Sequence, residues 1–178
     1  MRTLWNTGWL FARLEPGSSR ADLDDSVWQP VLLPHDWLIA DTDHLYLSGD
    51  GWYLKRFVYR PEDHPVGEEI LLSFDGVYMD AEVLLNGKVR CTHRYGYTAF
   101  YVRLTGLLRE GENEIAVHVR YLSPNSRWYS GAGIYRDVYL LTLPARHLVP
   151  DGFAVHTFLR EGSWHLPLTA ELSLPGSE

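Results

Sequence analysis

The sequence predicts an all-β protein, built as an antiparallel sandwich or jelly roll, and three observations support this. Apolar residues recur with a period of two along several short segments, as in strands that bury one face. Turn-forming residues separate these segments. No segment has the period of a long amphipathic helix, and only residues 19–25 suggest a short helical turn. Many short strands of this kind pack as two sheets.

The alternation is clearest in three segments, and three further apolar segments are typical of strands. The first group comprises residues 81–85, 100–104 and 115–121, and the second comprises residues 52–60, 70–74 and 138–143. In residues 115–121, Ile115, Val117 and Val119 alternate with Ala116 and His118. We expect the first set to face the core and the second to face outward.

Turn chemistry joins these segments. Asn86-Gly87 stands between two strand-like runs and predicts a type I′ hairpin, because both central residues of that turn need a positive φ. Pro61 ends the preceding strand, since proline cannot donate to a ladder.

A change in organisation falls at residues 144–150, so we expect one domain over residues 1–145 and a second segment over residues 146–178. Residues 153–159 and 166–174 of that segment resemble strands joined by a turn at residues 161–163. Two strands do not form a stable domain. They are therefore extra strands of the first sandwich or the opening of an incomplete second domain, and we favour the latter.

Composition limits the possible partners. The net charge of -7 argues against nucleic acid and anionic membranes, and no apolar run is long enough for a membrane span or a signal peptide. The one cysteine, Cys91, fits a reducing compartment, so we expect a cytoplasmic protein. We expect no cofactor and no metal, because the eight histidines lack the spacing of ligands.

The richest chemistry lies in residues 125–138, where arginines, aromatics, serines and glycines share one loop. Arg127 is the first candidate for ligand contact, because a planar guanidinium makes forked hydrogen bonds; a salt bridge to Asp36 or Asp50 is the structural alternative. The other candidates in this loop are Asn125, Ser126, Trp128 and Tyr129. The amide of Asn125 and the hydroxyl of Ser126 either bind sugar hydroxyls or stabilise the loop. The rings of Trp128 and Tyr129 either line a site or complete the core.

Three candidates lie earlier in the chain. Ser48 and Asp50 belong to a stretch that we read as a loop, and Asp36 follows His35. These side chains are suited to holding a ligand or a loop. For residues 35–37 we also expect a loop lock, in which Trp37 is buried and Asp36 accepts backbone N–H bonds.

Four stretches carry a family resemblance. They are Leu-Trp-Asn-Thr-Gly-Trp-Leu-Phe at residues 4–11, Pro-His-Asp-Trp at 34–37, Gly-Asp-Gly-Trp-Tyr at 49–53 and Asn-Ser-Arg-Trp-Tyr-Ser-Gly-Ala-Gly-Ile-Tyr-Arg at 125–136. With them, residues 3–143 resemble the N-terminal sugar-binding domain of glycoside hydrolase family 2, the β-galactosidase and β-glucuronidase family.

The resemblance implies a galactose-binding-domain-like jelly roll, followed by an immunoglobulin-like domain that residues 146–178 would open. It also implies a TIM barrel that carries the two catalytic glutamates of a retaining hydrolase, so no catalytic residue is expected in this chain. It places the loop of Ser48 and Asp50 at the mouth of the active site. Some members of the family bind a cation through an aspartate near the position that Arg127 occupies here. Because this chain has an arginine there, we do not expect that cation.

Two functions stay open. The first is the sugar-binding domain of a β-galactosidase-like family 2 hydrolase, contributing loop residues to a sugar subsite on the barrel. The alternative is a free-standing carbohydrate-binding module without hydrolase activity; a structural interaction domain is a weaker third. The expected partners are a β-linked glycoside, the remaining domains of the parent chain and a second copy bound through the exposed tail strands.

Overall fold

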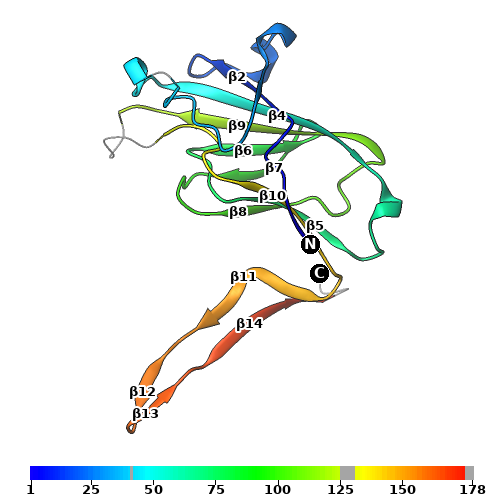
Figure 1. Cartoon of the computed structure of the whole chain (residues 1–178), viewed down its shortest axis with the longest axis vertical. Helices are drawn as coiled ribbons and strands as arrows, with labels where there is room; N and C mark the ends of the chain where they lie inside the picture. The colour runs from blue at the N-terminus through cyan, green and yellow to red at the C-terminus, as the bar shows by residue number, and fades with distance from the viewer. Residues whose placement is uncertain (41, 125–130, 175–178) are drawn as a thin grey trace.

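The computed structural model describes residues 1–40, 42–124 and 131–174 and shows two antiparallel sheets packed as a sandwich, with a two-stranded arm below it (Figure 1). The described residues contain no α-helix, which confirms the all-β prediction. Short 3-10 helices are η1 (Arg20–Asp22), η2 (Asp25–Val27), η3 (Thr42–His44) and η4 (Pro61–Asp63). None of the helices in the described ranges is long and apolar enough to cross a membrane.

The larger sheet has six strands in the order β3-β2-β4-β9-β6-β7. Their bounds are β2 (Trp9–Leu14), β3 (Gln29–Val31), β4 (Gly49–Tyr59), β6 (Ala81–Leu85), β7 (Lys88–His93) and β9 (Gly111–Tyr121). The long central pair, β4 and β9, runs in register from Gly49 opposite Tyr121 to Tyr59 opposite Gly111. This long pair forms the base from which the neighbouring loops extend.

The smaller sheet has four strands in the order β1-β10-β5-β8. Their bounds are β1 (Arg2–Leu4), β5 (Glu69–Phe74), β8 (Phe100–Arg103) and β10 (Val138–Leu143). The bounds of β10 are those expected from the sequence. β10 lies between β1 and β5, so a late strand joins the first residues of the chain to the middle of the sheet.

The core fills the space between the sheets. Val83, Val117 and Val119 of the larger sheet and Leu72 and Phe74 of the smaller sheet are fully buried. Each such side chain stabilises the fold by about 1.5–3 kcal/mol relative to an exposed one. The alternation seen in the sequence therefore marks the inner face of each strand correctly.

The hairpin between β6 and β7 has the predicted turn. Asn86 has φ 50° and Gly87 has φ 78°, so both central residues adopt the positive φ of a type I′ turn.

Residues after Leu143 form the arm. β11 (His147–Val155) pairs with β14 (Leu168–Ser173), and β12 (Phe158–Arg160) pairs with β13 (Ser163–His165). In the described residues these strands pair only with one another. The arm contacts the sandwich through His147, whose Nε2 lies 3.0 Å from Oε2 of Glu69, and through a hydrogen bond between Asp151 and Tyr101. The domain boundary at residues 145 and 146 stays a prediction.

Candidate functional site

The loops that carry the candidate residues gather at one end of the sandwich, which we call the loop end. β4 begins there and β9 finishes there, because Gly49 lies opposite Tyr121 (Figure 1, left). β6 also begins there, since Ala81 lies opposite Val119. The described residues of the connecting segments at this end include 15–28, 33–40, 42–48, 75–80, 94–99, 122–124 and 131–137.

Asp36 locks two of these segments together. Its Oδ1 accepts hydrogen bonds from the backbone N–H of Leu38 and of Ala132, each at 3.0 Å. The first bond shapes its own turn and the second ties that turn to a segment far along the chain. Trp37 beside it is only 5% exposed. The predicted loop lock at residues 35–37 is therefore confirmed.

The backbone on either side of Asp36 strengthens this lock. The N–H of His35 donates to the carbonyl of Ile134 at 2.8 Å, and the N–H of Trp37 donates to that of Ala132 at 3.1 Å. The side chain of Trp37 lies against Gly51 of β4, where a Cβ would stand 2.4 Å from the indole ring. Glycine at this position thus allows the ring to reach the sheet.

Gly133 marks the closest crossing. It has φ 126°, and a Cβ on it would stand 2.4 Å from Oη of Tyr53 and 2.5 Å from the carbonyl oxygen of His35. Both the conformation and the space require glycine. The glycine-rich part of the motif is therefore explained by packing against the loop lock.

Burial keeps the centre of the lock uncharged. Nδ1 of His35 lies 2.8 Å from Oη of Tyr53. Burial lowers the pKa of His35, partly opposed by the nearby Asp36, and burial raises the pKa of Tyr53 well above 10. Near neutral pH the imidazole and the phenol are both neutral, which suits a buried hydrogen bond.

Ser48 holds the opposite side of the motif. Its Oγ accepts from the N–H of Ser123 at 2.8 Å and donates to the carbonyl of Ser123 at 3.4 Å. Ser48 thus fixes the chain just before residues 125–130, and Asp36 fixes it just after them. The candidates Asn125, Ser126, Arg127, Trp128 and Tyr129 lie outside the described residues.

Asp50 is fully buried. We expected it in a loop, but it lies inside β4, so that prediction was wrong. Its Oδ2 accepts from the N–H of Gly17 at 2.6 Å. Its Oδ1 lies 2.5 Å from Nε2 of His118 and 3.5 Å from Nε of Arg120. These contacts join β4 to β9 and to the segment before η1, so Asp50 has a clear structural role. A contact between Asp50 and a ligand stays a prediction.

Two exposed tyrosines at the loop end were not singled out from the sequence. Tyr95 is 59% exposed and Tyr97 is 38% exposed. The Tyr97 ring packs edge-on against Tyr78 at 5.3 Å, and Tyr78 exchanges two backbone hydrogen bonds of 2.9 Å with Gly133. Exposed rings offer flat apolar surface next to the motif. The signal was the tripeptide Tyr-Gly-Tyr, because its glycine, Gly96, leaves room for Tyr78.

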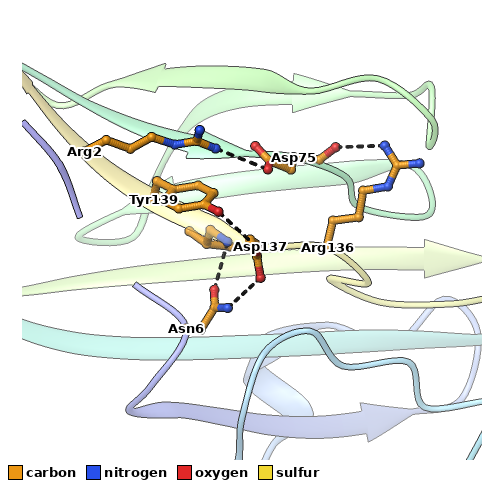
Figure 2. A network of polar contacts seen from close by, with 7 residues as sticks. Arg2, Asn6, Asp75, Arg136, Asp137 and Tyr139 are labelled. Carbon is orange, nitrogen blue, oxygen red and sulfur yellow. Dashed lines mark hydrogen bonds and ion pairs between the residues drawn. The ribbon is translucent and has the colours of Figure 1, made fainter. Parts of the chain in front are cut away.

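A polar network fastens the last part of the motif (Figure 2). Asp137 accepts from Nδ2 of Asn6 at 2.8 Å and from Oη of Tyr139 at 3.0 Å. Oδ1 of Asn6 in turn accepts from the N–H of Val138 at 2.9 Å. Asp137 is thereby a structural residue that anchors the start of β10.

The described residues contain no group of three or more His, Cys, Asp and Glu side chains that could hold a metal ion. Among the described residues at the loop end, Asp36 and Ser48 hold loops, and Tyr95 and Tyr97 expose aromatic surface.

Comparison with known proteins identifies the family. The model of the glycosyl hydrolases family 2 sugar binding domain matches residues 16–144. The chain therefore belongs to the family 2 glycosyl hydrolases, as the sequence motifs indicated.

Relatives agree with this assignment. A β-galactosidase of Bacteroides ovatus is 40% identical over 153 residues, which are 78% of this chain and 18% of that protein. A putative β-glucuronidase of Formosa agariphila is 32% identical over 169 residues, which are 88% of this chain and 16% of that protein. The crystal structure of a β-glycosidase from Bacteroides vulgatus matches with a TM-score of 0.80 at 30% identity, covering 100% of this chain and 25% of that one. The chain thus spans less than a fifth of the length of these two curated relatives.

Proposed function

We propose that this chain is the N-terminal sugar-binding domain of a retaining, β-galactosidase-like family 2 glycoside hydrolase. Its loop end contributes to the sugar subsite of a TIM barrel that carries the catalytic glutamates. The observation that carries this proposal is the double anchoring of residues 125–130. Ser48 fixes Ser123 on one side and Asp36 fixes Ala132 on the other.

The anchoring divides the candidate residues into two roles. Asp36 and Ser48 act as positioning residues, because their described hydrogen bonds go to the backbone of the motif segment. The ligand contacts are proposed above all for Arg127, and Tyr97, which packs on Tyr78 next to Gly133, adds an apolar face. Sugar rings have apolar faces and a rim of hydroxyls, so rings and donors side by side suit them.

The sugar itself is proposed from the relatives. The β-galactosidase of Bacteroides ovatus is 40% identical and the putative β-glucuronidase of Formosa agariphila is 32% identical. We favour a β-galactoside because the β-galactosidase shares the higher sequence identity with this chain. The single cysteine remains our reason to propose a cytoplasmic location.

The arm belongs to the same proposal as the first strands of an immunoglobulin-like domain. Its apolar side chains support this, since Trp164 is 69% exposed and Leu168 is 64% exposed. Side chains of this kind are normally buried. Further strands packed on the arm would cover them.

A domain exchange tests the proposed function. Residues 1–145 of this chain replace the matching segment of the Bacteroides ovatus β-galactosidase, and hydrolysis of 4-nitrophenyl β-galactoside is measured. We expect an active chimaera in which Asp36→Ala lowers kcat/KM about tenfold or more, because the loop beside the subsite loses its anchor. The matched control is Asp43→Ala, an exposed residue of η3. Equal kcat/KM in both variants would contradict the proposal.

Calorimetric titration of the isolated chain tests the free-standing module. With galactose, glucuronic acid or xylose we expect no binding at sub-millimolar Kd, because the proposed subsite needs the barrel as its other wall. Sub-millimolar binding that is lost in Arg127→Ala would favour the module instead.

A further inference from the structure

A groove of about 240 Å³ lies on the outer face of the six-stranded sheet, the face turned away from the core. It is lined by Asp80, Glu82, Thr92, Arg94, His118 and Arg120. These residues belong to β6, β7 and β9 or directly adjoin them. No residue of the predicted site lines this groove.

Strand register explains why these side chains meet. His118 of β9 lies opposite Glu82 of β6, and Glu82 lies opposite Thr92 of β7. Residues at even spacing along a strand share a face, so Asp80, Arg94 and Arg120 form the neighbouring row. The N–H of Arg120 donates to the carbonyl of Asp80 at 3.3 Å, which brings this second row together.

The charges in the groove are balanced. Two arginines, Arg94 and Arg120, are present with two exposed or half-buried carboxylates, Asp80 and Glu82. Within the described part of the chain, the side chains of Asp80, Thr92 and Arg94 make no hydrogen bond. Such a surface offers donors and acceptors in similar number and favours neither an anion nor a cation.

His118 gives the groove a fixed centre. Its Nε2 lies 2.5 Å from the buried carboxylate of Asp50, and its ring stacks on Trp52 with centroids 4.5 Å apart. Nδ1 lies 4.0 Å from Oε2 of Glu82, too far for a direct hydrogen bond. An oxygen atom at about 2.8 Å from each atom fits between them. A hydroxyl there can donate its proton to Oε2 of Glu82 or to Nδ1 of His118, since the carboxylate of Asp50 takes the proton on Nε2 as its hydrogen-bond donor.

We propose that this groove is a second binding site, for a neutral saccharide. Arg94 and Arg120 donate to its hydroxyls, Asp80 and Glu82 accept from them, and one hydroxyl lies between His118 and Glu82 and donates to one of the two. A neutral polyol matches balanced charges and makes both kinds of hydrogen bond with each hydroxyl group. The site lies mainly on the outer face of β6, β7 and β9 and reaches the loop end through Asp80 and Arg94, and none of its lining residues is a candidate of the proposed subsite.

Backbone amide NMR of the chain tests the site directly. The probes are methyl β-D-galactopyranoside and cellobiose, with methyl β-D-glucuronide as the charged comparison. We expect saturable shifts with both neutral probes at the amides of Glu82, Thr92 and Arg120, with Kd in the low millimolar range, and none at Ser48. The glucuronide should bind no more tightly than the galactoside. Shifts that are absent at tens of millimolar, or that appear only at the loop end, overturn the proposal.

Two variants with matched controls identify the groove as the site. Arg94→Ala and Glu82→Gln should each weaken binding of the neutral probe about tenfold, since each removes charged hydrogen bonds. Arg90→Ala on β7 and Glu112→Gln on β9 remove the same charges outside the groove and should leave Kd unchanged. Amide spectra of all four variants report whether the fold is intact. Wild-type affinity in a folded Arg94→Ala variant, or equal losses in the controls, would show that the groove does not bind the saccharide.

Discussion

The sandwich and the arm have the same local structure, but their apolar side chains differ in burial. Both consist of antiparallel strands joined by tight turns with a glycine at positive φ, such as Gly87 and Gly162. In the sandwich the apolar side chains meet a second sheet, and Trp9 is fully buried. In the arm no described residue forms an opposing layer over the strands, and Trp164 is 69% exposed.

The contrast teaches that period-two patterning fixes a strand but not its burial. Burial requires a second layer at the right distance, and hydrophobic stabilisation follows the area removed from water rather than the strand itself. The sandwich should therefore carry nearly all of the stability of this chain. Four predictions test this contrast.

Truncation of a tryptophan should separate the two regions most strongly. Trp9→Ala should lower the free energy of unfolding by about 4 kcal/mol, because it removes a buried ring that also donates to the carbonyl of Trp5. Trp164→Ala in the arm should change it by less than about 0.5 kcal/mol. Urea denaturation of both variants measures this. A large loss in Trp164→Ala would show that the arm is part of the cooperative unit.

Substitution of a glycine should give the next largest difference. Gly133→Ala should cost about 3 kcal/mol or more, since it combines a positive φ with contacts of 2.4 and 2.5 Å to Tyr53 and His35. Gly162→Ala is the matched control, because Gly162 also has a positive φ but nothing within 4 Å of a Cβ. It should cost about 1 kcal/mol. Similar losses in the two variants would mean that the loop lock relaxes freely around a methyl group.

Buried charge is the third difference. Lys55 is 8% exposed and donates to the carbonyl of Thr7, and burial lowers its pKa from 10.5 to about 8. Because the unfolded chain then binds more protons between these values, the folded state gains stability as pH rises from 8 towards 10.5.

Relative to Lys55→Met, the wild-type free energy of unfolding should therefore rise by about 2–3 kcal/mol between pH 7 and pH 10. Denaturation at both pH values measures the difference. Arg160→Met in the arm is the control, since the ion pair of Arg160 with Glu161 is exposed and worth little. A Lys55→Met variant that follows the wild type at both pH values would argue against a perturbed lysine.

Association should distinguish the regions in a further way. The exposed apolar side chains and unpaired edges of the arm are expected to bring two copies together. Light scattering should show an average mass above the monomer that rises with concentration. Deletion of residues 146–178 should leave a folded monomer. A wild-type chain that stays monomeric at high concentration would contradict this expectation.

The sequence predicted local structure well where a residue has a single solution. Asn86-Gly87 fixes its turn, Asp36 accepts the N–H of Leu38 two residues away, and β10 has its predicted bounds, because each of these depends on neighbours in the chain. Asp50 was read as a loop residue, before the strand expected at residues 52–60. In the structure the buried carboxylate of Asp50 is stabilised by contacts with His118 and with the N–H of Gly17. These partners are distant in sequence, and no pattern near Asp50 predicts them.

The outer-face groove could not be predicted for a related reason. Its six residues are unremarkable in sequence and become a site only when β6, β7 and β9 take their register. The same holds for the two anchors of residues 125–130, since Ser48 and Ser123 meet only through the pairing of β4 with β9. The order of the strands in the sheet decides which of these residues meet. That order depends on contacts between segments that are distant in sequence.

The pairing of β1 with β10 has a consequence for how the chain is made. All strands of the six-stranded sheet precede residue 122, so this sheet can assemble while synthesis continues. Arg2 lies opposite Leu141, and β10 also joins β5. Residues 2–4 must therefore wait, unpaired, until residues 138–143 have left the ribosome. The second sheet is therefore completed only at the end of translation of the sandwich, when β10 pairs with β1.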